Sequence, residues 1–255
     1  MKLFIFVLSS IFLFDVQGAY YSQCGQDKFV HENYFQSIKG GFFVDIGAHD
    51  GVSLSNTYFF ETEMNWSGLC VEPTPETFAQ LTKNRKCHCV NGCIANHKGV
   101  AKFLDISHFP GKEHIEKIDM LSGLIDKFDP RHLDRIELAI EQEVGTAEVI
   151  EVQCFLLNEL LDELNVYHVD FLSIDTEGGE FEILESIDFS RFQIDVITVE
   201  NNYGDPRFIP FLESKGYRFV EALAQDLLFI NKIVDPVFEK KKQTRAEKRR
   251  ERRKK

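Results

Sequence analysis

Short apolar runs alternate with amphipathic segments along most of this chain after its first forty residues. The runs at 169–174 and 194–199 have strand length, whereas 155–164 carries leucines at helical spacing. Strands that alternate with helices of about ten residues predict a mostly parallel sheet covered on both faces. Two closing apolar segments, 217–222 and 227–231, predict a terminal antiparallel hairpin. The pattern therefore predicts an α/β, doubly wound, Rossmann-like fold.

The N-terminus departs from this pattern. Lys2 precedes a 12-residue run, 3–14, that is apolar except for two serines, and small residues follow at Gly18 and Ala19. This arrangement is typical of a secretory signal peptide cleaved before Ala19, and the run is shorter than the roughly 20 residues that span a bilayer. We therefore expect a signal peptide at 1–18 and a mature protein in the lumen of the secretory pathway or outside the cell.

The cysteine content fits that compartment, because an even number of thiols can pair in an oxidising lumen. We therefore predict disulfide bonds, although the sequence alone leaves their connectivity open. The run 87–93 with His97 lacks the spacing typical of zinc sites, so we expect a disulfide or plain buried thiols there and no metal. The six residues are Cys24, Cys70, Cys87, Cys89, Cys93 and Cys154.

Charge divides the chain into two parts. Residues 239–255 contain 11 Lys/Arg and three Glu, a net charge of +8, so the rest carries −20 of the total of −12. A basic tail can bind nucleic acid or glycosaminoglycan, or be only a solvated charged segment. A signal peptide argues against nuclear import, and an acidic body argues against nucleic acid as the partner of the domain. We expect at most weak polyanion contact, made by the tail.

These boundaries leave one domain, 19–238, between the signal peptide and a tail that we expect to be disordered or helical. Within the domain, residues 107–148 fall outside the alternating pattern, although 129–142 has helical character. Long irregular insertions of this kind are usually functional or disordered. We therefore expect the insertion to select the substrate.

Candidate chemistry lies where the predicted strands end, because doubly wound sheets bind ligands outside the carboxyl ends of their strands. The first strand ends in a loop with Asp45, Gly47, His49 and Gly51, and the second ends at Glu72. The glycines allow close approach of a ligand, and a carboxylate at the second position can accept both hydroxyls of a ribose. The loop lacks the dinucleotide fingerprint, and the chain has no phosphate loop. A ligand with a ribose, a positive charge and no phosphate, such as S-adenosylmethionine, fits this arrangement.

At these residues the chain resembles the FkbM-type S-adenosylmethionine-dependent methyltransferases, in particular their eukaryotic branch. The resemblance implies the class I methyltransferase fold, with Asp45, Gly47 and Gly51 around the methionine moiety and Glu72 on the ribose. His49 departs from the usual glycine of the cofactor loop. The matching segments occur in family order at 22–27, 41–51, 54–57, 68–73, 84–85, 121–124, 169–180 and 199–201.

The same resemblance places two further parts of the site. The 92–94 turn, with Cys93 and Ile94, would border the adenine. Asp175, at the end of a later strand, would face the sulfonium or the methyl acceptor. It also implies an oxygen acceptor, which we expect to be a hydroxyl of a glycan or a small molecule.

Acidic residues after the strand 169–174 are the candidates for catalysis. A hydroxyl acceptor must lose its proton, and Asp175 or Glu177 could take it. Alternatively, the two could hold a divalent cation, or Glu177 and Glu180 could only stabilise a helix N-terminus. Residues 200–202 could bind the acceptor or form a turn. The rival to an enzyme is a binding or trafficking protein of the secretory lumen that kept the fold and lost turnover.

Overall fold

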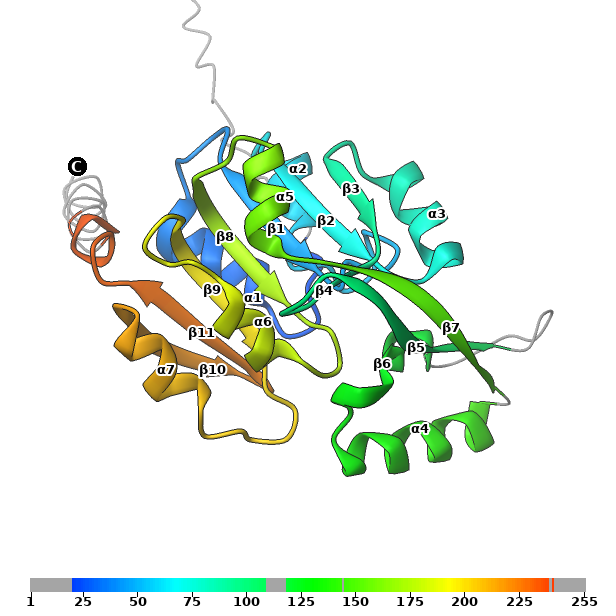
Figure 1. The fold of residues 1–255 in the computed structure, drawn as a ribbon. Helices are drawn as coiled ribbons and strands as arrows, with labels where there is room; N and C mark the ends of the chain where they lie inside the picture. Colours follow the sequence, from blue (N-terminus) through cyan, green and yellow to red (C-terminus); the bar gives the residue numbers. More distant parts are fainter. Residues whose placement is uncertain (1–19, 109–117, 144, 239, 241–255) are drawn as a thin grey trace, which may run out of the picture.

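The structure is a computed structural model that describes residues 20–108, 118–143, 145–238 and 240 (Figure 1). The predicted signal peptide and, apart from Lys240, the basic tail lie outside the described residues. In the parts that are described, no helix is long and apolar enough to cross a membrane.

The core of the molecule is a seven-stranded sheet with the order β10-β11-β9-β8-β1-β2-β3. Its strands are parallel except for β11, which pairs antiparallel with both β9 and β10. The predicted mostly parallel sheet and terminal hairpin are confirmed. The strands are β1 (Phe42–Ile46), β2 (Ser67–Glu72), β3 (His88–Asn91), β8 (His168–Ile174), β9 (Gln193–Glu200), β10 (Tyr217–Leu223) and β11 (Asp226–Asn231).

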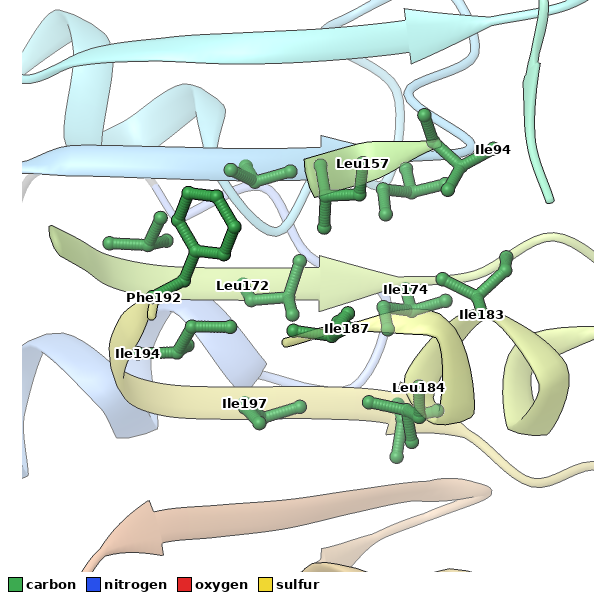
Figure 2. Packing of buried hydrophobic residues seen from close by; sticks show 14 of the residues in the cluster. Ile94, Leu157, Leu172, Ile174, Ile183, Leu184, Ile187, Phe192, Ile194 and Ile197 are labelled. Atoms are coloured by element: carbon green, nitrogen blue, oxygen red, sulfur yellow. The ribbon is translucent and has the colours of Figure 1, made fainter. Parts of the chain in front are cut away.

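Both faces of this sheet are buried, which explains why the central strands read as continuous apolar runs. On one face, Leu172 of β8 and Ile197 of β9 belong to one buried cluster with Leu157 of α5 (Leu157–Glu163) and Ile183 of α6 (Glu180–Ser186) (Figure 2). α7 (Phe208–Ser214) joins the same cluster.

The opposite face is covered by an aromatic-rich N-terminal layer. Phe43 and Phe171 of the sheet pack in one cluster with Phe35, Phe60 and Trp66. This layer contains α1 (Gln26–Val30), the π-helical turn η1 (His31–Phe35) and α2 (Tyr58–Thr62), and α3 (Pro75–Asn84) adds Leu81 to the cluster.

A second sheet of four strands, with the order β4-β7-β5-β6, extends from the carboxyl edge of the first (Figure 1). Its long antiparallel ribbon pairs β5 with β7 and packs α4 against a small core of its own. The elements are β4 (Cys93–Ile94), β5 (Gly99–His108), the 3-10 turns η2 (Ile118–Leu121) and η3 (Ile125–Lys127), β6 (Gly123–Leu124), α4 (Pro130–Glu143) and β7 (Gly145–Phe155).

The strand predicted at 87–94 is divided between the two sheets. β3 belongs to the large sheet and β4 to the small one, with Gly92 between them. Gly92 has φ +153, and a Cβ there would lie 2.4 Å from the backbone oxygen of Gln153. Only glycine allows the chain to leave one sheet and enter the other at this point.

Candidate active site

A cavity of about 690 Å³ lies at the carboxyl ends of β1, β2, β8 and β9. The large sheet supplies its floor, and the second sheet with η2 and α4 supplies one wall. β1 lies between β2 and β8, so the chain reverses its direction of winding at this edge. Such a switch point is where doubly wound sheets bind ligands.

The loop after β1 is held tightly between its two neighbours. Asp175 donates its backbone N–H to Ile46, and a Cβ on Gly47, at φ +85, would lie 1.6 Å from the backbone oxygen of Asp175. The N–H groups of Gly47 and Ala48 both donate to Val71. Gly47 is therefore required because the ends of β1 and β8 approach closely.

Glu72 is buried at the end of β2, with both carboxylate oxygens fixed by the backbone. Its Oε2 accepts the N–H of His49 at 2.9 Å, and its Oε1 accepts the N–H of Thr74 at 2.9 Å. Burial raises the pKa of this carboxyl. Each oxygen keeps a further acceptor site, and the residue lines the cavity. This geometry suits the predicted contact with two ribose hydroxyls.

Asp45 lines the cavity but makes its contacts within the protein. Its Oδ2 accepts the hydroxyl of Thr57 at 2.6 Å and lies 4.0 Å from an Arg85 nitrogen. Burial raises the pKa of Asp45, and Arg85 opposes that shift. In the structure Asp45 therefore orders the loop before α2.

Gly51 does not line the cavity. At φ +81, a Cβ there would lie 2.6 Å from Leu81 and 2.7 Å from Arg85. Its carbonyl accepts a hydrogen bond from Arg85 at 3.0 Å. The absence of a side chain at Gly51 therefore allows α3 and Arg85 to pack closely against the loop after β1, residues 47–51.

His49 connects the cofactor loop to the second sheet. Its Nε2 lies 2.9 Å from Oδ2 of Asp119 in η2, and both residues line the cavity. Burial alone would lower the pKa of His49, but the hydrogen bond to Asp119 and the Asp50 carboxylate 3.7 Å away outweigh that effect and raise it to about 9. At neutral pH His49 is therefore a cation. Cys93 and Ile94 also line the cavity, together with Gly92, and their contact with adenine stays a prediction.

Three acids, two from the loop after β8 and one from the end of β9, converge at the cavity. Carboxylate oxygens of Asp175, Glu177 and Glu200 lie within 4.8 Å of one another. Burial raises the pKa of both Asp175 and Glu200, and repulsion from neighbouring acids adds to the shift. Oxygens at this spacing also suit a divalent cation. A proton held between Asp175 and Glu200 relieves the same repulsion, as in carboxyl pairs elsewhere.

Glu177 receives the most contacts of the three. Asn202 donates to its Oε2 at 3.0 Å, and an Arg135 nitrogen lies 3.3 Å and a His132 nitrogen 3.4 Å from the same oxygen. Burial raises the pKa of Glu177 to about 7, despite the opposing effect of Arg135. A carboxylate with a pKa near neutrality is matched to proton abstraction at physiological pH.

The remaining polar candidates are structural. Glu180 accepts the N–H groups of Thr176 and Gly178, so it holds the loop before α6. Asn201 exchanges hydrogen bonds with the backbone of Asp205 and closes a turn. Of residues 200–202, the first lines the cavity, the second forms the turn and the third orients Glu177.

Sequence reasoning missed the roles of Arg135 and His132. The insertion was expected to contribute to the site, but nothing in an amphipathic helical pattern shows which side chains reach across to Glu177. Arg85 belonged to a matching segment, yet its contacts to three separated parts of the chain are visible only in the fold.

All six cysteines, including Cys93 of the cavity lining, are free thiols in this structure, so the predicted disulfides are not present in it. The sulfurs of Cys70 and Cys87 lie 3.5 Å apart. Among the described residues, one further group has metal-ligand spacing: His168, Asp170 and Asp195. His168 and Asp195 form an ion pair at 3.0 Å, and Asp170 accepts the N–H of Phe42.

Comparison with known proteins places the chain in a family. The Methyltransferase FkbM domain matches residues 45–219. The chain belongs to the FkbM methyltransferase family. Methyltransferase 1 of Beauveria bassiana (strain ARSEF 2860) is 26% identical to this FkbM-family chain over 187 residues, which are 69% of this chain and 72% of that protein.

Two solved structures are similar at low identity. The methyltransferase FkbM of Methylobacillus flagellatus KT matches 80% of this chain and 50% of its own, with 12% identity and a TM-score of 0.42. The N-terminal domain of human METTL16 in complex with SAH matches 81% and 66%, with 14% identity and a TM-score of 0.40. The FkbM-family chain thus spans half the length of the first of these structures.

Family membership confirms the resemblance drawn from the sequence, and the sheet order agrees with the predicted Rossmann-like fold. The protein is an S-adenosylmethionine-dependent methyltransferase by family. The roles of individual residues in the cavity stay predictions from their geometry.

Proposed function

We propose that this FkbM-family protein methylates a hydroxyl oxygen of a glycan or small molecule in the secretory pathway, with Glu177 as the general base. The observation that carries the proposal is a largely buried carboxyl with a pKa of about 7, held by Asn202 and Arg135 at the edge of the cavity.

The residues present fit the methyl donor. Glu72 offers two fixed oxygens to the ribose, and Cys93 and Ile94 offer an apolar edge to the adenine. When bound, S-adenosylmethionine supplies an electrophilic methyl group on a sulfonium cation. Asp175 and Glu200 give their end of the cavity an acidic character that favours a cation.

Glu177 would act on the acceptor. When the acceptor oxygen takes the methyl group, whose bond to the sulfonium sulfur breaks, the hydroxyl proton would move to a carboxylate oxygen of Glu177. Asp175, adjacent to Glu177, would orient the hydroxyl through a hydrogen bond. Holding the acceptor in line supplies much of the remaining rate enhancement.

The insertion supports selection of a polar acceptor. Lys127 and Arg135 line the cavity from η3 and α4, beside the apolar Leu121 and Leu124. A wall that mixes charged and apolar groups suits a sugar or a similar hydroxyl compound. The secretory location rests on the signal-peptide pattern of residues 1–18.

Transfer of a tritiated methyl group from S-adenosylmethionine to a panel of methyl glycosides and small alcohols tests the proposal. We expect transfer by the wild type, and a loss of kcat of about 10²–10⁴-fold in Glu177→Gln, because a positioned base contributes that factor. Affinity for S-adenosylmethionine, measured by calorimetry, should stay within threefold.

The matched control is Glu185→Gln, which neutralises an exposed acid on α6 and should keep the full rate. If Glu177→Gln also keeps the full rate, Glu177 is not the base. If the wild type binds S-adenosylmethionine but methylates no oxygen acceptor, the binding-protein alternative is the better account.

A further inference from the structure

His132 on α4 is fully buried, and the hydrogen bonds of its ring define its protonation. The ring stacks on Phe128, with centroids 4.7 Å apart. Its Nε2 lies 3.0 Å from the carbonyl oxygen of Leu121, which can only accept, so Nε2 carries the hydrogen. Burial lowers the pKa of His132. The neutral ring then has a bare Nδ1.

That bare nitrogen lies between the hydroxyl of Tyr203 and the carboxyl group of Glu177. The hydroxyl of Tyr203 is 3.0 Å from Nδ1 and donates to it. Oε2 of Glu177 is 3.4 Å from the same Nδ1. Nδ1 has one lone pair, which accepts the Tyr203 hydroxyl at rest and lies within reach of a proton carried by Oε2 of Glu177.

Three other charged residues surround His132 and Tyr203. Among the described residues, none of these three forms an ion pair with Nδ1 of His132. On α4, Arg135 contacts Glu177 and disfavours a charge on His132. Before α4, Asp129 favours that charge but is held by Arg131 at 2.7 Å. Arg131 also lies over the Tyr203 ring, at 4.7 Å from its centroid.

We propose that His132 and Tyr203 form a proton-exit relay for Glu177. The inference rests on the proposed function, in which Glu177 takes the hydroxyl proton of the acceptor. That proton passes from Oε2 of Glu177 to Nδ1 of His132, which restores the carboxylate and forms an imidazolium. The partly exposed Tyr203 then releases its own proton to water and takes the Nδ1 proton on its oxygen, which returns His132 to the neutral ring.

Together these transfers move one proton from the acceptor to solvent and return Glu177, His132 and Tyr203 to their starting protonation states. His132 touches neither substrate nor cofactor, so it acts through Glu177. Because His132 lies on α4, this helix contributes to proton transfer as well as lining the cavity.

Nuclear magnetic resonance of the full chain with ¹⁵N-labelled histidine tests the relay without cofactor or acceptor. Long-range ¹H–¹⁵N spectra should show His132 as the Nε2–H tautomer at pH 8. Glu177→Gln should lower the pKa of His132 by about 1–3 units, since an adjacent opposite charge raises it by that amount. Glu137→Gln, which removes an exposed acid from the same helix, should leave it unchanged.

A Nδ1–H tautomer, or a His132 titration that Glu177→Gln does not move, would overturn the relay. A second measurement uses turnover: His132→Ala should slow methyl transfer at unchanged KM for the acceptor, and added imidazole should restore the rate. Slow transfer without rescue would show a purely structural His132. Absence of transfer by the wild type would instead contradict the proposed function and leave the spectroscopic result standing.

Discussion

Three residues around the cavity adopt a backbone conformation that their side chains disfavour. His49, Leu54 and Glu177 have φ values of 48°, 55° and 55°, and all three line the cavity. Left-handed conformations of non-glycine residues cost energy and persist where the surrounding structure enforces them. For His49 the constraint comes from two sides, because its N–H binds Glu72 and its ring binds Asp119.

The ion pair of His49 makes stability depend on pH. The folded pKa of about 9 lies above the unfolded value near 6.5, so the stabilisation is fully present below pH 6.5 and is lost as pH rises through 9. That difference corresponds to about 3 kcal/mol at most. In urea titrations, we expect the stability advantage of the wild type over His49→Gln to fall by up to that amount between pH 6 and 9.5.

The same titrations include His97→Gln as a control, because His97 is exposed and lies outside the cavity. This variant should follow the wild type across the whole range. A wild type and His49→Gln with parallel pH profiles would contradict the assigned ion pair.

At the scale of elements, Arg85 joins three parts of the N-terminal layer. The residue follows α3, and its buried guanidinium binds Glu61 of α2, the carbonyl of Gly51 and the hydroxyl of Thr57. Its side chain also lies 5.0 Å from the centroid of the Phe43 ring on β1. One cation therefore fixes the cofactor loop relative to two helices and the sheet.

Removing this cation should be strongly destabilising, because Asp45 and Glu61 would remain without their partner. We expect Arg85→Gln to lower the free energy of unfolding by about 3–5 kcal/mol, as for other broken buried ion pairs. Arg191→Gln breaks the largely exposed pair with Asp162 and should cost less than about 1 kcal/mol. Equal losses in the two variants, measured by urea unfolding, would show that Arg85 is not the link described.

At the scale of the whole molecule, the large sheet could be predicted because its strands have a clear apolar pattern. The carboxyl-end rule then located Glu72, Asp175 and Glu177 in one cavity. The second sheet could not be predicted, because β7 is mostly exposed and lacks that pattern. For the same reason, the contacts of His132 and Arg135 with Glu177 depend on a packing that local sequence does not encode.

The charge division belongs to this scale as well. Residues 1–238 carry a net charge of −20, and part of that charge lies at the cavity, in Asp175, Glu177 and Glu200. His49, Lys127 and Arg135 are the basic residues among those lining the cavity. This distribution favours a cationic cofactor at the carboxyl edge of the sheet and a polar acceptor beside α4.

The most direct test of this account is a calorimetric titration of the protein with S-adenosylmethionine. We predict saturable binding by the wild type, and an affinity at least tenfold lower for Glu72→Gln, because a hydrogen bond to a charged group contributes about 1.5–3 kcal/mol. Glu76→Gln, at an exposed position four residues later, should bind like the wild type. Absence of binding at millimolar ligand, or full affinity in a folded Glu72→Gln, would contradict the assignment of this cavity to the cofactor.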